Sequence, residues 1–140
     1  PPGCKLVRTA RRIPTLLFTT HTAPQVRRTR FESAGCEVRI VQQSRGGGVS
    51  LHAVLAELGR RRMTNLMIEG GSRMLGAFFD AGLADELLVF TAPKIIGGRG
   101  APGPLGGRGV PRVPPETLQI VERRRCGPDE MIRARVGPRP

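Results

Sequence analysis

The residues with the clearest chemical potential lie at one junction, where Glu69, Gly70 and Gly71 follow an apolar run and precede an amphipathic segment. Two adjacent glycines let a backbone turn sharply and let a ligand approach without meeting a Cβ atom. The first amides of a helix that starts here, at residues 72–75, lack intrahelical acceptors. Together with the helix dipole, they favour an anion such as a pyrophosphate. The Arg73 guanidinium can add a charge-assisted contact to that anion.

The same residues allow other interpretations. Gly71 and Gly76 have the spacing of the two P-loop glycines, but Ala77 and Phe78 stand where that motif has lysine and serine or threonine. This argues against phosphoryl transfer, and G-x-G-x-x-G is absent as well. A glycine pair before a helix is also typical of a plain tight turn, and the Glu69 carboxylate can serve only to accept turn amides. Gly76 is expected to let the helix or a cofactor pack closely.

Strands and helices alternate along the chain and place this junction after a strand. Apolar runs of period two predict strands, and apolar residues at helical spacing predict helices. The strands are expected at residues 15–20, 36–41, 65–68, 86–91, 118–122 and 131–136. The helical segments are expected at residues 24–33 (a short helix or turn), after Ser50 with a stripe of Leu51, Val54, Leu55 and Leu58, and before Gly82 with a stripe of Met74, Leu75, Phe78 and Phe79.

This order predicts an α/β fold with a mostly parallel sheet flanked by helices and a C-terminal antiparallel hairpin. The wholly apolar run 65–68 is typical of a strand buried on both faces. Ligands of such sheets bind beyond the carboxyl ends of the strands, which is where Glu69 lies. The 140 residues suit one compact domain, assigned to residues 1–136, with 137–140 as a tail and a Gly/Pro-rich loop at 97–115. No apolar run approaches the roughly 20 residues of a membrane-spanning helix, so no membrane partner is expected.

The net charge of +12 raises the question of nucleic-acid binding. Only Lys5 and Lys94 are lysines, and the other basic residues are scattered arginines, which is typical of the amino-acid bias of a GC-rich genome. The chain has no Trp or Tyr for base stacking. We interpret the charge as a solvated basic surface and expect no nucleic-acid partner.

The cysteines and histidines show no spacing that holds a metal. Cys4, Cys36 and Cys126 form no C-x-x-C pair, and His21 and His52 are isolated. The H-x-E and P-C-x-x-C motifs of zinc deaminases are absent. We therefore expect no metal site and no disulfide framework, as in a reduced cytoplasmic protein.

Three motifs follow one another along the second half of the chain: MIEGGSRML at residues 67–75, FFDAGLADEL at 78–87 and APKIIGG at 92–98. Together they resemble the reductase domain of the riboflavin-biosynthesis deaminase/reductase proteins. The loop at residues 100–107 and the opening at 1–10 are similar to the same family, so the resemblance extends from Pro1 to about Val136.

The resemblance implies the fold of dihydrofolate reductase and an NADPH-dependent oxidoreductase. The implied reaction is the reduction of 5-amino-6-(5-phosphoribosylamino)uracil, a pyrimidine ribosyl phosphate, by hydride transfer from NADPH to C1′ of the ring-opened ribosyl group. The match to the family motif implies that Glu69 contacts the substrate. The resemblance identifies no catalytic proton donor, so the catalytic residues stay unknown. The residues implied to bind NADPH are Gly70, Gly71, Ser72, Arg73, Met74, Leu75, Gly76 and Ala77.

The resemblance also implies a cytoplasmic homodimer with a zinc deaminase domain fused upstream. That domain and the first strand of the reductase domain are missing, and the chain begins at Pro1 rather than Met. We interpret this as an N-terminal truncation and expect the 140 residues alone to be inactive. Two alternatives stay open: a dihydrofolate-reductase-like oxidoreductase for another substrate, and a non-catalytic nucleotide-binding or dimerisation module.

Overall fold

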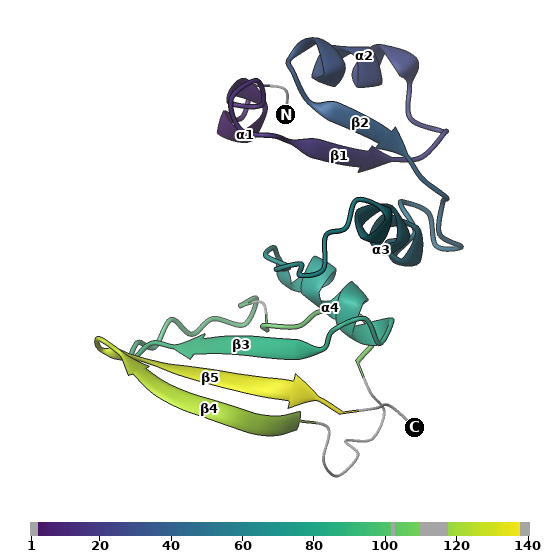
Figure 1. Cartoon of the computed structure of the whole chain (residues 1–140). Helices are drawn as coiled ribbons and strands as arrows, with labels where there is room; N and C mark the ends of the chain where they lie inside the picture. Colours follow the sequence, from purple (N-terminus) through teal and green to yellow (C-terminus); the bar gives the residue numbers. More distant parts are fainter. Residues whose placement is uncertain (1–2, 102, 110–117, 138–140) are drawn as a thin grey trace. The chain divides into compact units, whose positions relative to one another are not determined.

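The computed structural model describes residues 3–101, 103–109 and 118–137. The chain divides into two compact units, Pro1–Leu66 and Met67–Pro140, and each is considered by itself (Figure 1). The assignment of residues 1–136 to a single domain stays a prediction.

The first unit is built on two parallel strands. β1 (Leu16–Thr19) and β2 (Glu37–Ile40) pair in parallel from Leu16 opposite Glu37 to Thr19 opposite Ile40. α2 (Gln25–Ser33) connects them, as a parallel pair requires a crossover. The strands expected at 15–20 and 36–41 and the helix or turn expected at 24–33 are thereby confirmed.

A small apolar core lies between this crossover and the short helix α1 (Lys5–Arg8). Val7, Ala10 and Cys36 are buried there, and the partly buried residues packed against them are Cys4, Leu17, Phe31 and Ala34. Cys36 thus acts as a small hydrophobic core residue, which is the usual environment of a free cysteine.

α3 (Leu51–Arg60) forms for the reasons that its sequence indicates. The Ser50 hydroxyl accepts a hydrogen bond from the Ala53 N–H at 3.3 Å, which is the contact of an N-cap residue. Val54 and Leu58 are buried, and Leu51 and Leu55 are half-buried. The expected cap and apolar stripe are both confirmed.

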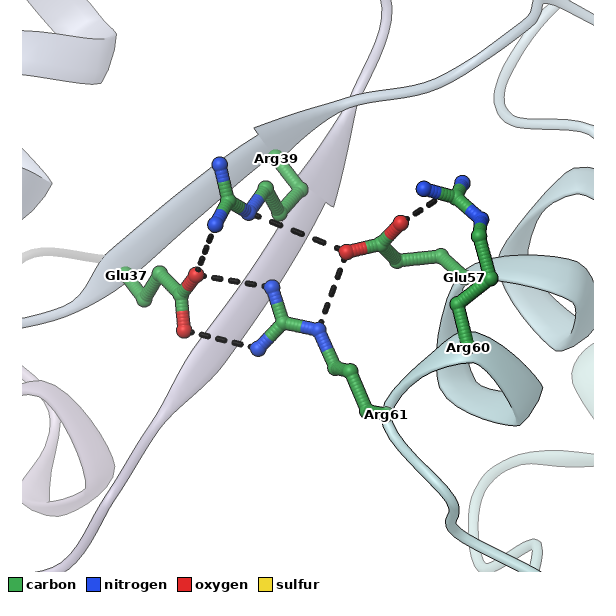
Figure 2. Close-up of polar contacts among 5 residues, drawn as sticks. All are labelled: Glu37, Arg39, Glu57, Arg60 and Arg61. Atoms are coloured by element: carbon green, nitrogen blue, oxygen red, sulfur yellow. Dashed lines mark hydrogen bonds and ion pairs between the residues drawn. The ribbon is translucent and has the colours of Figure 1, made fainter.

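An ionic cluster of Glu37, Arg39, Glu57, Arg60 and Arg61 joins α3 to β2 (Figure 2). The Glu57 carboxylate, whose side chain is only 11% exposed, accepts from Arg61 Nε at 2.9 Å and from Arg60 at 2.7 Å. Arg61 also reaches across to Glu37 on β2, and Arg39 contacts Glu37 at 2.7 Å. Because three guanidinium groups surround two carboxylates, the cluster carries a net positive charge.

The second unit contains α4 (Ser72–Asp80) and an antiparallel sheet. Its strands β3 (Glu86–Thr91), β4 (Leu118–Cys126) and β5 (Asp129–Val136) lie in the order β3-β5-β4 (Figure 1). The expected hairpin is confirmed, with Cys126 opposite Asp129 across a turn in which Gly127 has a φ of 63°. Both hairpin strands extend closer to that turn than expected, because cross-strand pairing continues through the arginine run 123–125.

The α/β class is confirmed, but two expectations about the sheet differ from the structure. Within the described residues, parallel pairing is confined to β1 and β2, and the neighbour of β3 is the antiparallel β5. The strand expected at 65–68 is not formed: this segment has no helix or strand, and Leu66 and Met67 are 48% and 71% exposed. A β-strand forms only where its backbone can hydrogen-bond to a neighbouring strand. An apolar run indicates that a segment is buried, but it does not identify such a neighbouring strand.

The Gly/Pro-rich segment expected at 97–115 has no helix or strand over its described residues 97–101 and 103–109, and the remainder lies outside the described residues. Among the helices that the structure describes, none has the length and apolar character to cross a bilayer.

Candidate cofactor-binding turn

The turn from Glu69 to α4 has ordinary backbone geometry. Gly71, the N-cap residue, has φ −71° and ψ 161°, and neither Gly70 nor Gly71 has a positive φ. The Gly71 angles are ones that any L-residue adopts, so this position needs no left-handed conformation. A Cβ on Gly71 would meet no atom within 4 Å. The absence of a side chain at Gly71 leaves its backbone uncovered, so a ligand can approach it closely.

The first turn of α4 offers fewer free amides than the sequence suggested. The N–H groups of Met74 and Leu75 both donate to the Gly71 carbonyl, at 3.0 and 3.3 Å. In the part of the chain that the structure describes, the N–H groups of Ser72 and Arg73 have no acceptor, and no side chain caps the helix. The site that the helix dipole favours for an anion is thus defined by two adjacent amides.

The charged side chains of the turn are available to a ligand. Glu69 and Arg73 are exposed, and neither forms an ion pair or a side-chain hydrogen bond with another described residue. The alternative in which Glu69 serves to accept turn amides therefore has no contact to support it. Met74 is 53% exposed, Ala77 is exposed and Leu75 is half-buried, so these residues point to different sides of the helix.

Gly76 has a neighbour that sequence reasoning missed. Residues 106–108, called the strap below, lie against α4, and a Cβ on Gly76 would overlap the carbonyl group of Gly106. The Gly106 N–H donates to the Ser72 carbonyl at 2.8 Å, and the Arg108 N–H donates to Asp80 Oδ2 at 2.7 Å. Close packing at Gly76 is thus with the chain's own loop; contact of Gly76 with a cofactor stays a prediction.

A hollow in the second unit lies away from the turn. It has a volume of about 440 Å³ and is open to solvent. Its lining comes from the end of β3, the arginine run of β4 and the hairpin turn: Thr91, Ala92, Pro93, Arg123, Arg124, Arg125, Pro128, Asp129 and Glu130. None of residues 69–77 lines it.

Metal chemistry finds no support in the described residues. Histidine, cysteine, aspartate and glutamate side chains form no group of three or more that could hold an ion there. His21 and His52 are exposed and isolated, and Cys4, Cys36 and Cys126 are free thiols.

Two solved structures show that the fold recurs. RibD of Acinetobacter baumannii superimposes with a TM-score of 0.73 over 98% of this chain and 34% of that protein, at 17% identity. A pyrimidine reductase-like protein of Corynebacterium diphtheriae superimposes with a TM-score of 0.71 over 89% of this chain and 50% of that protein, at 21% identity.

Sequence relatives point the same way. The riboflavin biosynthesis protein RibD of Actinobacillus pleuropneumoniae is 31% identical over 113 residues, which are 81% of this chain and 30% of that protein. A 2,5-diamino-6-ribosylamino-4(3H)-pyrimidinone 5′-phosphate reductase of Aquifex aeolicus is 33% identical over 100 residues, 71% of this chain and 43% of that protein. The chain therefore spans less than half the length of these relatives.

The family follows from a match along nearly the whole chain. The model of the RibD C-terminal domain matches residues 1–132, and the chain belongs to that family. The family resemblance that motifs 67–75, 78–87 and 92–98 indicated is thereby confirmed.

Proposed function

We propose that this chain carries the reductase activity of riboflavin biosynthesis, the NADPH-dependent reduction of the ribosyl group of 5-amino-6-(5-phosphoribosylamino)uracil to the ribitylamino product. Membership of the RibD C-terminal domain family supports the proposal, as do relatives named as reductases of pyrimidinone or uracil ribosyl phosphates. The observation that carries it is the pair of unsatisfied amides at Ser72 and Arg73 beside the uncovered Gly71.

The residues of the turn fit the phosphate end of a dinucleotide. Two adjacent N–H groups at a helix N-terminus bind a phosphate oxygen, and the exposed Arg73 guanidinium supplies a positive charge next to them. The open space over Gly71 leaves room for the approach. When bound, NADPH would supply the hydride; the protein's part is to orient it and to balance charge.

Glu69 is assigned to the substrate. It lies two residues before the helix N-cap, and its carboxylate is exposed and uncommitted to any described residue. A carboxylate in that state can accept hydrogen bonds from the hydroxyl or amino groups of a sugar–pyrimidine substrate. The proton donor of the reaction is not assigned to a residue.

The wider organisation is proposed on family grounds. The chain covers 30% of the A. pleuropneumoniae RibD protein, so most of that relative lies outside the match. A zinc deaminase domain fused upstream, a homodimeric assembly and a cytoplasmic location are the arrangement that we infer.

Replacement of Gly71 by valine tests the cofactor site. Gly71→Val should weaken NADPH binding more than tenfold, because a branched side chain covers the two amides, while the fold tolerates it at these backbone angles. NADPH fluorescence titration of the full chain measures the dissociation constant. Gly46→Val is the matched control, since Gly46 also has ordinary angles and open space but lies far from the turn in sequence. An unchanged dissociation constant for Gly71→Val would place the cofactor elsewhere.

A further inference from the structure

One face of α4 is shaped to hold the strap. Ser72, Gly76 and Asp80 follow at intervals of four residues and therefore lie on the same side of the helix. The strap contacts all three positions: Gly106 bonds to the Ser72 carbonyl, its carbonyl lies over Gly76, and Arg108 bonds to Asp80. The strap thus lies along the whole length of the helix.

Glycine is required on both sides of this contact. A Cβ on Gly76 would lie 2.9 Å from the Gly107 nitrogen as well as overlapping Gly106. Gly107 has a φ of 92°, which L-residues rarely adopt, and a Cβ there would lie 3.0 Å from Asp80 Cγ. The close approach of the helix and strap backbones therefore depends on glycine at positions 76 and 107.

Asp80 stands where a carboxylate is unfavourable for the helix alone. It is the last residue of α4, next to the negative end of the helix dipole. Among the described residues, the hydrogen-bond partner of this carboxylate is the Arg108 N–H, which donates to Asp80 Oδ2 at 2.7 Å. The position of Asp80 is thus explained by the strap and not by the helix.

The other end of the strap contacts the proposed cofactor site directly. The Ser72 carbonyl, which accepts the Gly106 N–H, belongs to the same peptide group as the Arg73 N–H, one of the two free amides. A Cβ on Gly106 would lie 3.1 Å from that carbonyl oxygen and 3.3 Å from the Arg73 nitrogen. A hydrogen bond to a carbonyl oxygen polarises the peptide group and strengthens its N–H as a donor.

We propose that the strap is a working part of the cofactor site, fixing and polarising the Ser72–Arg73 peptide so that its N–H binds the pyrophosphate. Gly76 and Asp80 are then positioning residues, which act on the cofactor through the strap. This inference rests on the proposed function, since it takes the α4 turn as the NADPH site. It also gives Gly76 a role in cofactor binding that needs no contact between the two.

Replacement of Gly76 by alanine displaces the strap without adding charge. In the full chain, Gly76→Ala should weaken NADPH binding about tenfold and increase the initial rate of tryptic cleavage after Arg108 several-fold, as followed by mass spectrometry. Gly59→Ala is the matched control: Gly59 lies in helix α3, where an added Cβ would meet no atom within 4 Å, so the gain in helix propensity is shared and the clash is not. This control should leave both readouts unchanged.

Two substitutions of Asp80 distinguish a role in positioning the strap from a general effect on stability. Asp80→Ala should weaken NADPH binding and expose the strap to trypsin, whereas Asp80→Asn, whose amide oxygen still accepts the Arg108 N–H, should restore most of both. Asp85→Ala is the control, since Asp85 is exposed and its side chain forms no hydrogen bond or ion pair with a described residue. Far-UV circular dichroism should show α4 and the sheet intact in each variant.

The outcomes distinguish the inference from the function on which it rests. If wild type binds NADPH and Gly76→Ala releases the strap with an unchanged dissociation constant, the inference is overturned and the proposed function stands. If wild type binds no NADPH while the strap is still protected from trypsin, the proposed function fails and the inference fails with it. Loss of affinity in Gly76→Ala and Asp80→Ala, with recovery in Asp80→Asn, supports both.

Discussion

Arg61 and Glu37 form a two-bond guanidinium–carboxylate pair, with Nη1 and Nη2 of the arginine 2.8 and 2.7 Å from the two carboxylate oxygens (Figure 2). The remaining Nε of Arg61 donates to Glu57 at 2.9 Å. One planar guanidinium therefore joins the end of α3 to β2 through two hydrogen bonds and holds Glu57 of α3 through a third. A lysine offers a single point charge and cannot reproduce this geometry.

The pair predicts a loss of stability in acid. The hydrogen bonds from Arg61, with the charges of Arg61 and Arg39, lower the pKa of Glu37 from its ordinary value of 4.5 to about 2. Between those two values the unfolded chain binds more protons than the folded chain, so the free energy of unfolding falls as the pH falls. The contribution is fully present above pH 4.5 and is lost by about pH 2. Thermal unfolding followed by far-UV circular dichroism at several pH values measures it.

Replacement of Glu37 isolates that contribution. Glu37→Gln should unfold at a lower temperature at pH 7 and show a shallower loss between pH 4.5 and pH 2. Glu32→Gln is the control, because Glu32 is exposed and its carboxylate forms no hydrogen bond or ion pair with a described residue. Equal pH dependence in wild type and Glu37→Gln would contradict the prediction.

The cap of α3 predicts a second stability effect. Ser50→Ala removes the acceptor of the Ala53 N–H and should lower the free energy of unfolding by about 1 kcal/mol. Ser50→Asp keeps an acceptor and adds a negative charge at the helix N-terminus, so it should be neutral or stabilising. Urea titrations give the difference. A loss in Ser50→Asp equal to that in Ser50→Ala would show that the hydroxyl acts in another way.

Much of the fold could be predicted because its signals are local. The stripe of α3, its Ser50 cap and the turn at Gly127 depend on residues within a few positions of one another. The strand expected at 65–68 failed because strand formation depends on a neighbour that the apolar run does not specify. The pairing of β3 with β5 was missed for the same reason, since these strands lie about 40 residues apart in sequence.

The candidate site was predicted in outline but not in its contacts. The start of the helix after Gly71 could be predicted from the sequence. The number of free amides could not, because the Gly71 carbonyl accepts hydrogen bonds from two of the four, those of Met74 and Leu75. The strap was missed because residues 100–107 have no periodic pattern. A signal was present in the glycine at position 76 and the aspartate at position 80, which follow Ser72 along the helix at intervals of four residues.

Glu69 should matter for turnover and not for stability. Glu69→Gln keeps the shape and removes the charge, and no described residue depends on that charge. In the complete reductase domain, we expect kcat/KM to fall about tenfold or more, which corresponds to ~1.4 kcal/mol of transition-state stabilisation. The NADPH dissociation constant should change by less than about twofold, within the difference that ~0.4 kcal/mol makes. Glu32→Gln again serves as the control, and a lower melting temperature with unchanged activity per folded molecule would make Glu69 structural.

The arginine run of β4 bears on the remaining question of nucleic-acid binding. Side chains alternate between the two faces of a strand, so Arg123 and Arg125 lie on one face while Arg124 lies on the other, opposite Met131. Arg123 faces Glu130 at 3.9 Å, and Arg133 lies 3.3 Å from Glu122. These carboxylates reduce the positive charge that the sheet offers to a phosphate backbone.

A random oligonucleotide should accordingly bind this protein weakly and without sequence preference. Its attraction would come from scattered arginines of a chain with net charge +12, and contacts of that kind are lost as counterions are added back. Fluorescence anisotropy with a labelled single strand and a duplex should give dissociation constants of about 10⁻⁶ M or weaker at low salt, with binding abolished near 150 mM. Arg123→Gln and Arg124→Gln should each reduce the residual affinity slightly and equally, because each removes one of many scattered positive charges. A submicromolar complex that survives physiological salt, or a much larger loss in one variant than in the other, would show that the basic surface is a nucleic-acid site after all.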